Sequence, residues 1–267
     1  MTRLALGLEY DGAAFMGWQR QSHAGRTVQA VVEAAIAKVA DHSVEITCAG
    51  RTDAGVHATG QVAHFDTHVV RSLRGWLLGL NSNLPPDVAV NWVREVPDGF
   101  HARYRARARQ YRYTILNRLT RSAVTRAQAT WIHRPLNELR MQAAARHLLG
   151  EHDFSAFRAA ECQAHSPVRT IHALDARREG EYILIDVVAN GFLHHMVRNI
   201  VGVMIAIGEG KQEPDWARKV LEGRDRALAG TTAPPQGLCF MAVLYPQVYD
   251  IPVPEGALFG SLSVNLQ

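Results

Sequence analysis

The sequence predicts an α+β fold of two successive β-α-β-β-α-β halves, a duplicated ferredoxin-like architecture with mainly antiparallel sheets joined around a central basic cleft. Strand-like alternation and helical spacing of apolar residues follow the same order twice along the chain. At 267 residues, 47% hydrophobic and 20% charged, the chain suits one large or two small globular domains. The turn signal Pro97-Asp98-Gly99 separates the halves. We therefore expect domains at 1–98 and 99–245, followed by a tail at 246–267.

The first half contains four expected strands and two expected helices. Apolar residues alternate with other residues in the strands and recur every three or four positions in the helices. In chain order these are a strand at 4–10, a helix at 28–39, strands at 44–48 and 61–66, a helix at 73–80 and a strand at 88–96. This order is one complete β-α-β-β-α-β unit.

The second half repeats this order and adds one helix. Its expected elements are a strand at 111–116, a helix at 136–149, strands at 171–177 and 182–188, helices at 192–207 and 214–223, and a closing strand at 239–245. Pro214 suits the first turn of the added helix. The tail has little periodicity and two prolines, so we expect it to be extended or loosely packed.

Composition narrows the class of protein. The net charge of +4 and the pI near 9.1 suit a polyanionic partner without proving one. Only three of the 29 basic residues are lysines, which favours phosphate and base contacts, although an arginine-favouring genome would give the same excess. The cysteines Cys48, Cys162 and Cys239 lie far apart, which predicts neither disulfides nor a thiolate zinc site and favours a reducing cytoplasm. The longest uncharged apolar run, 200–208, is far below the roughly 18 residues of a membrane span, so we expect neither export nor membrane insertion.

The nine residues 50–58, Gly-Arg-Thr-Asp-Ala-Gly-Val-His-Ala, are the strongest indication of chemistry. Gly50 and Gly55 allow a sharp turn and a close approach of a bulky ligand to Asp53. The alternative is an aspartate that only caps a turn through its own backbone.

Together with Tyr10-Asp11-Gly12, Gly17-Trp18-Gln19 and Thr27-Val28-Gln29, this string resembles the tRNA pseudouridine synthase A family. Further matching segments follow in the family's order at 100–115, 152–157, 166–169, 192–202 and 233–238. The resemblance implies an isomerase that converts uridine to pseudouridine at positions 38, 39 and 40 in the anticodon stem-loop of tRNA. It also implies a cytoplasmic homodimer. No cofactor is expected, because the reaction has no net redox change and loses no group.

The resemblance also assigns roles to individual residues. Asp53 is the nucleophile, and whether it attacks C6 of the base or C1′ of the sugar stays open. Because a carboxylate that is excluded from water needs a cationic partner to stay charged, Arg198 is assigned to hold that charge. Arg51 is implicated in drawing the target nucleotide out of the stack, and Leu238 resembles a small apolar wall of the site.

A tyrosine that packs on the target base completes these assignments. Strand alternation places Tyr111 and Tyr113 on the same face, so either could carry the ring or lie in the core. Only the resemblance selects Tyr111.

Four arginines precede that tyrosine at alternate positions: Arg103, Arg105, Arg107 and Arg109. In an extended segment all four would point to one side and form a phosphate-binding stripe. The alternative is a solvated edge strand that its charges protect from pairing.

Other classes of site and function have weaker support. Among 13 histidines, His57, His64 and the His194-His195 pair lack ligand spacing, so no metal site is expected. An RNA chaperone without catalysis would keep the fold and the arginines. A nucleoside or glycoside hydrolase would need a second carboxylate, for which no obvious candidate appears.

Overall fold

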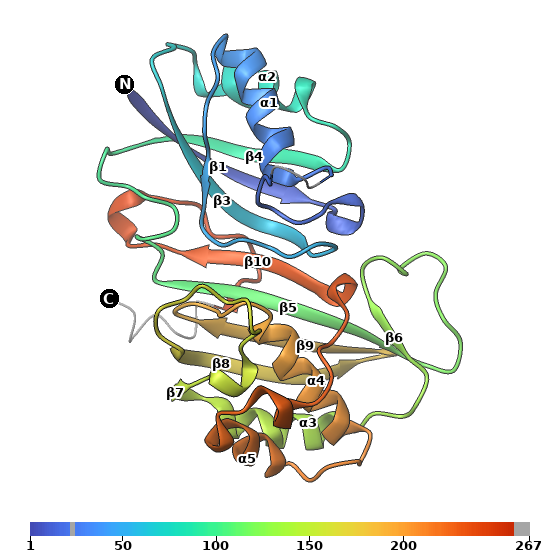
Figure 1. Cartoon of the computed structure of the whole chain (residues 1–267). Coiled ribbons are helices and arrows are strands. Elements are labelled where there is room, and N and C mark those ends of the chain that lie inside the picture. The colour runs from blue at the N-terminus through green and yellow to red at the C-terminus, as the bar shows by residue number, and fades with distance from the viewer. Residues whose placement is uncertain (22–24, 259–267) are drawn as a thin grey trace. The chain divides into compact units, whose positions relative to one another are not determined.

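The computed structural model describes residues 1–21 and 25–258, and the chain divides into two compact units (Figure 1). Unit 1 contains Met1–Arg109 and the chain from Cys239 onward, and unit 2 contains Gln110–Leu238. From the sequence we expected the boundary at residue 98 and the closing strand in the second half. In the structure, residues 99–109 and nearly all of that strand are grouped with unit 1. The last nine residues of the expected tail lie outside the described residues.

Unit 1 combines two helices with a mostly antiparallel sheet. Its elements are β1 (Thr2–Tyr10), α1 (Val28–Ala40), β2 (Thr47–Cys48), β3 (His57–Thr67), α2 (Leu73–Asn83), β4 (Val88–Val96) and β10 (Leu238–Leu244), with short 3-10 turns η1 (Gly12–Ala14) and η6 (Gln247–Tyr249). The strand order is β4-β1-β3, and β2 pairs antiparallel with β3. Strand β10 pairs with β3 in parallel through Cys239↔His57.

The core of unit 1 follows the predicted apolar positions. Leu6 is fully buried in β1, opposite Ala63 of β3 and Val93 of β4. Helix α1 buries most of one face, and α2 packs against α1 and β4. Strand β2 is shorter than the expected 44–48, because the backbone N–H of Ile46 donates to Glu33 Oε1 at 3.2 Å and so leaves the ladder.

The strands of unit 2 follow the order β5-β9-β8-β7, and β6 pairs in parallel with β5. Its main elements are β5 (Ala108–Asn117), β6 (Thr130–Ile132), α3 (Glu138–Ala145), β7 (Gly150–Asp153), β8 (Val168–Glu179), β9 (Tyr182–Ala189), α4 (Met196–Gly208) and α5 (Trp216–Gly223). The 3-10 turns are η2 (Arg146–Leu148), η3 (Ser155–Phe157), η4 (Arg226–Ala229) and η5 (Pro235–Gly237). Both units therefore confirm the α+β class with mostly antiparallel pairing.

Local capping explains where the helices of unit 2 differ from expectation. Helix α3 begins after Asn137, whose side chain accepts from the backbone N–H of Arg140 at 3.0 Å. Helix α4 begins four residues later than expected, since His195 has a positive φ of 60°. Strands β6 and β7 were not predicted, because three or four residues are too short for a periodic signal. None of the helices within residues 1–21 and 25–258 has the length and apolar character of a membrane span.

Candidate active site

The predicted site residues fall in both units. Asp53 and Arg51 belong to unit 1, together with the arginines of residues 103–109. Tyr111, Arg198 and Leu238 belong to unit 2.

Asp53 lies in the loop that connects β2 to β3, between a buried and an exposed neighbour. Thr52 is only 6% exposed, whereas Ala54 is exposed and Asp53 is half-buried. The backbone N–H of Val56 donates to Asp53 O at 3.2 Å and closes a tight turn. Gly55 takes a positive φ of 77° in that turn, whereas Gly50, for which we expected the same freedom, does not have a positive φ.

The residues next to Asp53 are anchored to the sheet of unit 1. Tyr10 at the end of β1 places its hydroxyl 2.8 Å from Thr52 Oγ1. Gln61 of β3 donates to Gly50 O at 2.7 Å. These bonds fix the loop from two strands, and burial raises the pKa of Tyr10, which therefore stays a neutral hydroxyl partner.

The segment Phe15–Trp18 packs against the other side of the Asp53 loop. Trp18 donates its backbone N–H to Thr52 O at 2.9 Å, and Gly55 donates to Phe15 O at 3.2 Å. Gly17, with φ 95°, approaches the loop so closely that an added Cβ would lie 2.8 Å from Thr52 O. This contact requires a glycine.

The start of α1 completes this packing. Val28 and Gln29 donate their backbone N–H groups to Gly17 O and Trp18 O at 3.2 and 3.0 Å. Four motifs that are separate in the sequence therefore form one hydrogen-bonded body around Asp53 in unit 1. Arg51, the residue assigned to nucleotide extrusion, is exposed on this body.

The expected extended stripe of arginines is wrong in geometry. Residues 102–105 form a turn, and regular strand structure begins only at Ala108. His101 causes the turn: its Nδ1 accepts from the backbone N–H groups of Arg103 and Tyr104 at 3.2 Å each, and its carbonyl accepts from Arg105 N at 3.0 Å. Such side-chain capping of a turn competes with strand formation.

Three of the four arginines remain exposed, and the fourth has a structural role. Arg103 and Arg105 are exposed on the turn, and Arg107 is exposed just after it. Arg109 donates through Nη2 to Arg103 O at 2.6 Å and through Nε to Ala49 O at 3.3 Å. It therefore joins the arginine turn to the strand end that leads into the Asp53 loop.

In unit 2 the two candidate tyrosines have different environments. The hydroxyl of Tyr113 donates to Pro234 O at 2.8 Å and lies 2.6 Å from Thr130 Oγ1. Tyr113 is fully buried, whereas Tyr111 is 7% exposed and packs edge-on against the ring of Phe192, with centroids 5.0 Å apart. Tyr113 is therefore a core residue, which alternation alone did not reveal.

Arg198 lies in the first turn of α4 and is half-buried. Its Nε donates to Ala233 O at 2.8 Å, and Ala233 N donates back to Arg198 O at 3.1 Å. The reciprocal pair fixes both the backbone and the guanidinium plane of Arg198. Leu238, the expected apolar wall residue, is 5% exposed at the start of β10.

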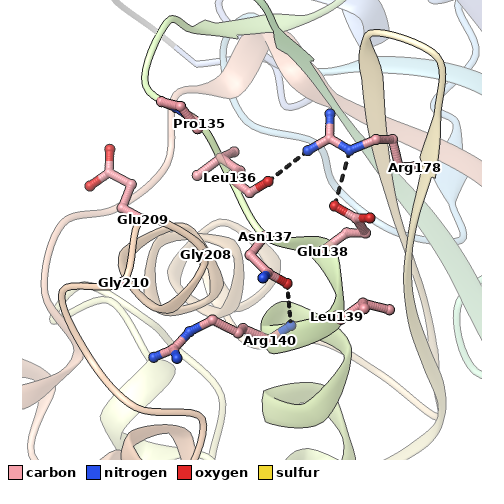
Figure 2. A pocket seen from close by; sticks show the side chains of 10 residues that line it. All are labelled: Pro135, Leu136, Asn137, Glu138, Leu139, Arg140, Arg178, Gly208, Glu209 and Gly210. Atoms are coloured by element: carbon pink, nitrogen blue, oxygen red, sulfur yellow. Dashed lines mark hydrogen bonds and ion pairs between the residues drawn. The ribbon is translucent and has the colours of Figure 1, made fainter.

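A hollow of about 530 Å³ opens elsewhere in unit 2, and no predicted site residue lines it (Figure 2). Arg178 bridges Leu136 O and Glu138 Oε2 at 2.7 and 3.0 Å on one side of it. Glu209 on the other side pairs with Arg134 at 2.7 Å and with Lys211. The first pair holds α3 to β8, and the second holds the end of α4 to the segment between β6 and α3, which indicates a structural role.

From the sequence we did not identify Gln61 and His101, nor the hydrogen bonds of Arg226 and Thr232 to Asn199 of α4. Gln61 is fully buried within a strand, and a buried glutamine is an unusual signal that could have been noticed. His101 gave no signal apart from its place in a matched motif. The contacts of Arg226 and Thr232 with α4 depend on tertiary structure, so no local pattern could have found them.

Comparison with known proteins identifies the class to which this fold and these residues belong. The family model described as "tRNA pseudouridine synthase" matches residues 8–105 and 144–246, which is more than half of the chain. The "tRNA pseudouridine synthase A" of Methylococcus capsulatus is 56% identical over 93% of this chain and 92% of its own length. The proteins of the same name from Alcanivorax borkumensis and Vibrio parahaemolyticus are 52% and 50% identical, over 94% and 96% of this chain and 94% and 97% of their own lengths.

The chain belongs to the tRNA pseudouridine synthase A family. It is accordingly an isomerase that converts uridine to pseudouridine in tRNA.

Proposed function

We propose that this enzyme modifies uridines 38, 39 and 40 in the anticodon stem-loop of tRNA, with Asp53 as its nucleophile. The observation that carries the proposal is the rigid loop around Asp53. Tyr10, Gln61 and the segment at Gly17 fix the backbone on both sides of this one carboxylate. A nucleophile held in place before the substrate binds is what covalent catalysis by a carboxylate requires.

The chemistry needs little beyond that carboxylate and a pocket that retains the base. The N1–C1′ bond breaks, the base rotates in place, and C5 bonds to C1′ while the hydrogen at C5 is lost to solvent and replaced at N1. Electrons balance without an oxidant or reductant, so no cofactor is proposed. The proposal is the same whether Asp53 attacks C6 of the base or C1′ of the sugar.

The remaining roles follow the family motif residue by residue. Arg198 holds the negative charge of Asp53 during the reaction, and Tyr111 packs on the target base. Arg51, which is exposed, draws the uridine out of the stack, at a cost of about a few kcal/mol. Leu238 contributes an apolar wall.

Phosphate contacts are proposed for the exposed arginines of the turn. Arg103, Arg105 and Arg107 can each approach a phosphate, so binding should weaken steeply with salt. Arg109 contributes indirectly, because it supports the turn through Arg103 O.

We also propose the larger organisation that the family resemblance implies: duplicated ferredoxin-like halves around a basic cleft, in a cytoplasmic homodimer. The order β4-β1-β3-β2 with two helices in unit 1 supports the ferredoxin-like assignment of that half. The dimer and the compartment have only the resemblance as support.

The test is to incubate purified protein with unmodified tRNA and map the modified uridines. Wild type should produce pseudouridine at positions 38 to 40, Asp53→Asn should produce none while folding normally, and Asp41→Asn, at the C-terminal end of α1, should behave as wild type. Pseudouridine formation by Asp53→Asn would show that the nucleophile assignment is wrong. Tight tRNA binding by wild type without product would indicate a chaperone, and release of free uracil would indicate a hydrolase.

A further inference from the structure

A hydrogen-bonded cluster on α4 involves three residues that have no role in the proposed chemistry. We call Asn199, Arg226 and Thr232 the α4 clamp. Asn199 is fully buried, and its Oδ1 accepts from Thr232 Oγ1 at 2.7 Å and from Arg226 Nη2 at 3.0 Å. Arg226 Nη2 also donates to Thr232 Oγ1 at 2.7 Å, so the three side chains close a ring.

Further bonds tie the clamp to its surroundings. Asn199 Nδ2 donates to Phe157 O at 2.8 Å, and Arg226 Nη1 donates to Gly230 O at 2.8 Å. Arg226 thus bonds both to the loop that precedes Thr232 and to the helix. Its guanidinium group is directed at protein acceptors and is half-buried.

Close packing brings this loop against α4. A Cβ added to Gly202 would collide with Thr231 O, so only glycine permits the approach. Gly202 lies one helical turn after Arg198 and Asn199, on the same side of α4. The 231–233 segment therefore runs along the helix from Gly202 back to Arg198.

The clamp and the Arg198 contacts are adjacent along both chains. Arg198 exchanges two hydrogen bonds with Ala233, and the next residue, Asn199, bonds to Thr232, the residue before Ala233. If the loop moved away from α4, Ala233 O would carry the Nε partner of Arg198 with it. The direction of the Arg198 guanidinium therefore depends on the clamp.

We propose that Arg226 is a positioning residue: through Asn199 and Thr232 it holds the loop that orients Arg198. This inference rests on the proposed function, because it assumes that Arg198 acts in the reaction. Since Arg226 acts through the loop and not on RNA, its loss should lower kcat and leave KM for tRNA nearly unchanged. A misplacement of the order of 1 Å in a catalytic site can cost about 100-fold in rate, so we expect Arg226→Ala to lower kcat roughly 10- to 100-fold.

The experiment measures kcat and KM for pseudouridine formation in the full-length enzyme. The variants are Arg226→Ala, Arg198→Ala and the double variant, together with Thr232→Val and Thr232→Ser. The control is Arg218→Ala, which removes an exposed, ion-paired arginine of α5. Thr232→Val removes the bridging hydroxyl at similar volume, and Thr232→Ser keeps it, so Ser should restore the rate that Val loses.

Non-additivity separates positioning from a general structural role. In the Arg198→Ala background, Arg226→Ala should change kcat less than twofold, because the group it orients is already missing. If the two losses multiply, or if Arg226→Ala raises KM with kcat intact, the positioning role is refuted. Should Arg226→Ala fail to fold, the Val and Ser variants of Thr232 decide the question in the same way.

The result also distinguishes this inference from the proposed function. A wild-type protein that makes no pseudouridine, or an Arg198→Ala variant with full activity, refutes the function assigned to Arg198. An active enzyme in which Arg198→Ala is impaired while Arg226→Ala and Thr232→Val lower only the melting temperature refutes the positioning role alone.

Discussion

Replacing Gly17 by alanine should displace the Asp53 loop and lower the stability of the protein. Gly17 has φ 95°, a conformation that costs a residue with a Cβ about 1–2 kcal/mol. The new Cβ would lie 2.8 Å from Thr52 O, whereas ordinary contact begins at 3.4 Å, so the loop must move by about 0.6 Å. Overpacking of this kind costs about 1–3 kcal/mol, which gives a total of about 2–5 kcal/mol in the free energy of unfolding.

The same displacement should reach catalysis. Thr52 precedes Asp53 in the chain, so a shift of Thr52 also displaces Asp53. A misplacement of about 1 Å in a catalytic site can cost about 100-fold in rate. We therefore expect Gly17→Ala to lower kcat by roughly 10-fold or more. Thermal unfolding gives the stability change, and release of tritium from tRNA labelled at uridine C5 gives kcat.

Gly210→Ala is the matched control. Gly210 also has a positive φ, 76°, but a Cβ there meets nothing within 4 Å. It should lose only the backbone contribution of about 1–2 kcal/mol and keep full activity. Equal losses of stability in the two variants, with kcat of Gly17→Ala within twofold of wild type, would refute the reasoning that close packing at Gly17 positions Asp53.

Three further predictions concern the two cores. Tyr113→Phe removes the hydrogen bond from the buried hydroxyl to Pro234 O, so the free energy of unfolding by denaturant should fall by about 1–2 kcal/mol while kcat stays unchanged. A loss of activity at full stability would contradict the assignment of Tyr113 to the core. Burial, together with the nearby His101, lowers the pKa of His64 to about 4. The free energy of unfolding should therefore fall as the pH drops from about 6.5 to about 4, by about 1–2 kcal/mol when solvent screening is taken into account. His64→Asn should flatten this acid limb in pH-dependent unfolding, and an unchanged limb would exclude His64 as its cause. Asp186→Ala leaves Arg112 without its fully buried bidentate partner, so the free energy of unfolding in urea should fall by about 3–5 kcal/mol. A fall of less than about 1 kcal/mol would show that the ion pair does not contribute to stability.

Much of the fold could be predicted because the signals were local. The strand at 88–96 was predicted at its observed bounds, and the helix at 28–39 differs from α1 by one residue. The predicted bounds were wrong where an interaction or a backbone conformation outside the apolar pattern ended or delayed an element. Strand β2 is short because Glu33 accepts the backbone N–H of Ile46. Helix α4 starts later than expected because His195 has a positive φ.

The family motifs could be identified from the sequence, but the contacts that hold them in place could not. Motif order indicated Asp53 and Arg198 from one sequence, and the family assignment is confirmed by the comparisons. Their roles stay predictions. The expected arginine stripe failed because alternation presumes an extended backbone, and the imidazole of His101 folds that backbone into a turn.

Arg109 links two segments that lie far apart in the sequence. One guanidinium holds both the carbonyl of Arg103, within the exposed turn, and that of Ala49, next to the first glycine of the Asp53 loop. The exposed turn and the start of the Asp53 loop are thus connected through one side chain. A lysine has a single nitrogen at its tip and could not hold both carbonyls with the same rigidity. Arg109→Lys would therefore keep the charge but weaken the connection between the turn and the Asp53 loop.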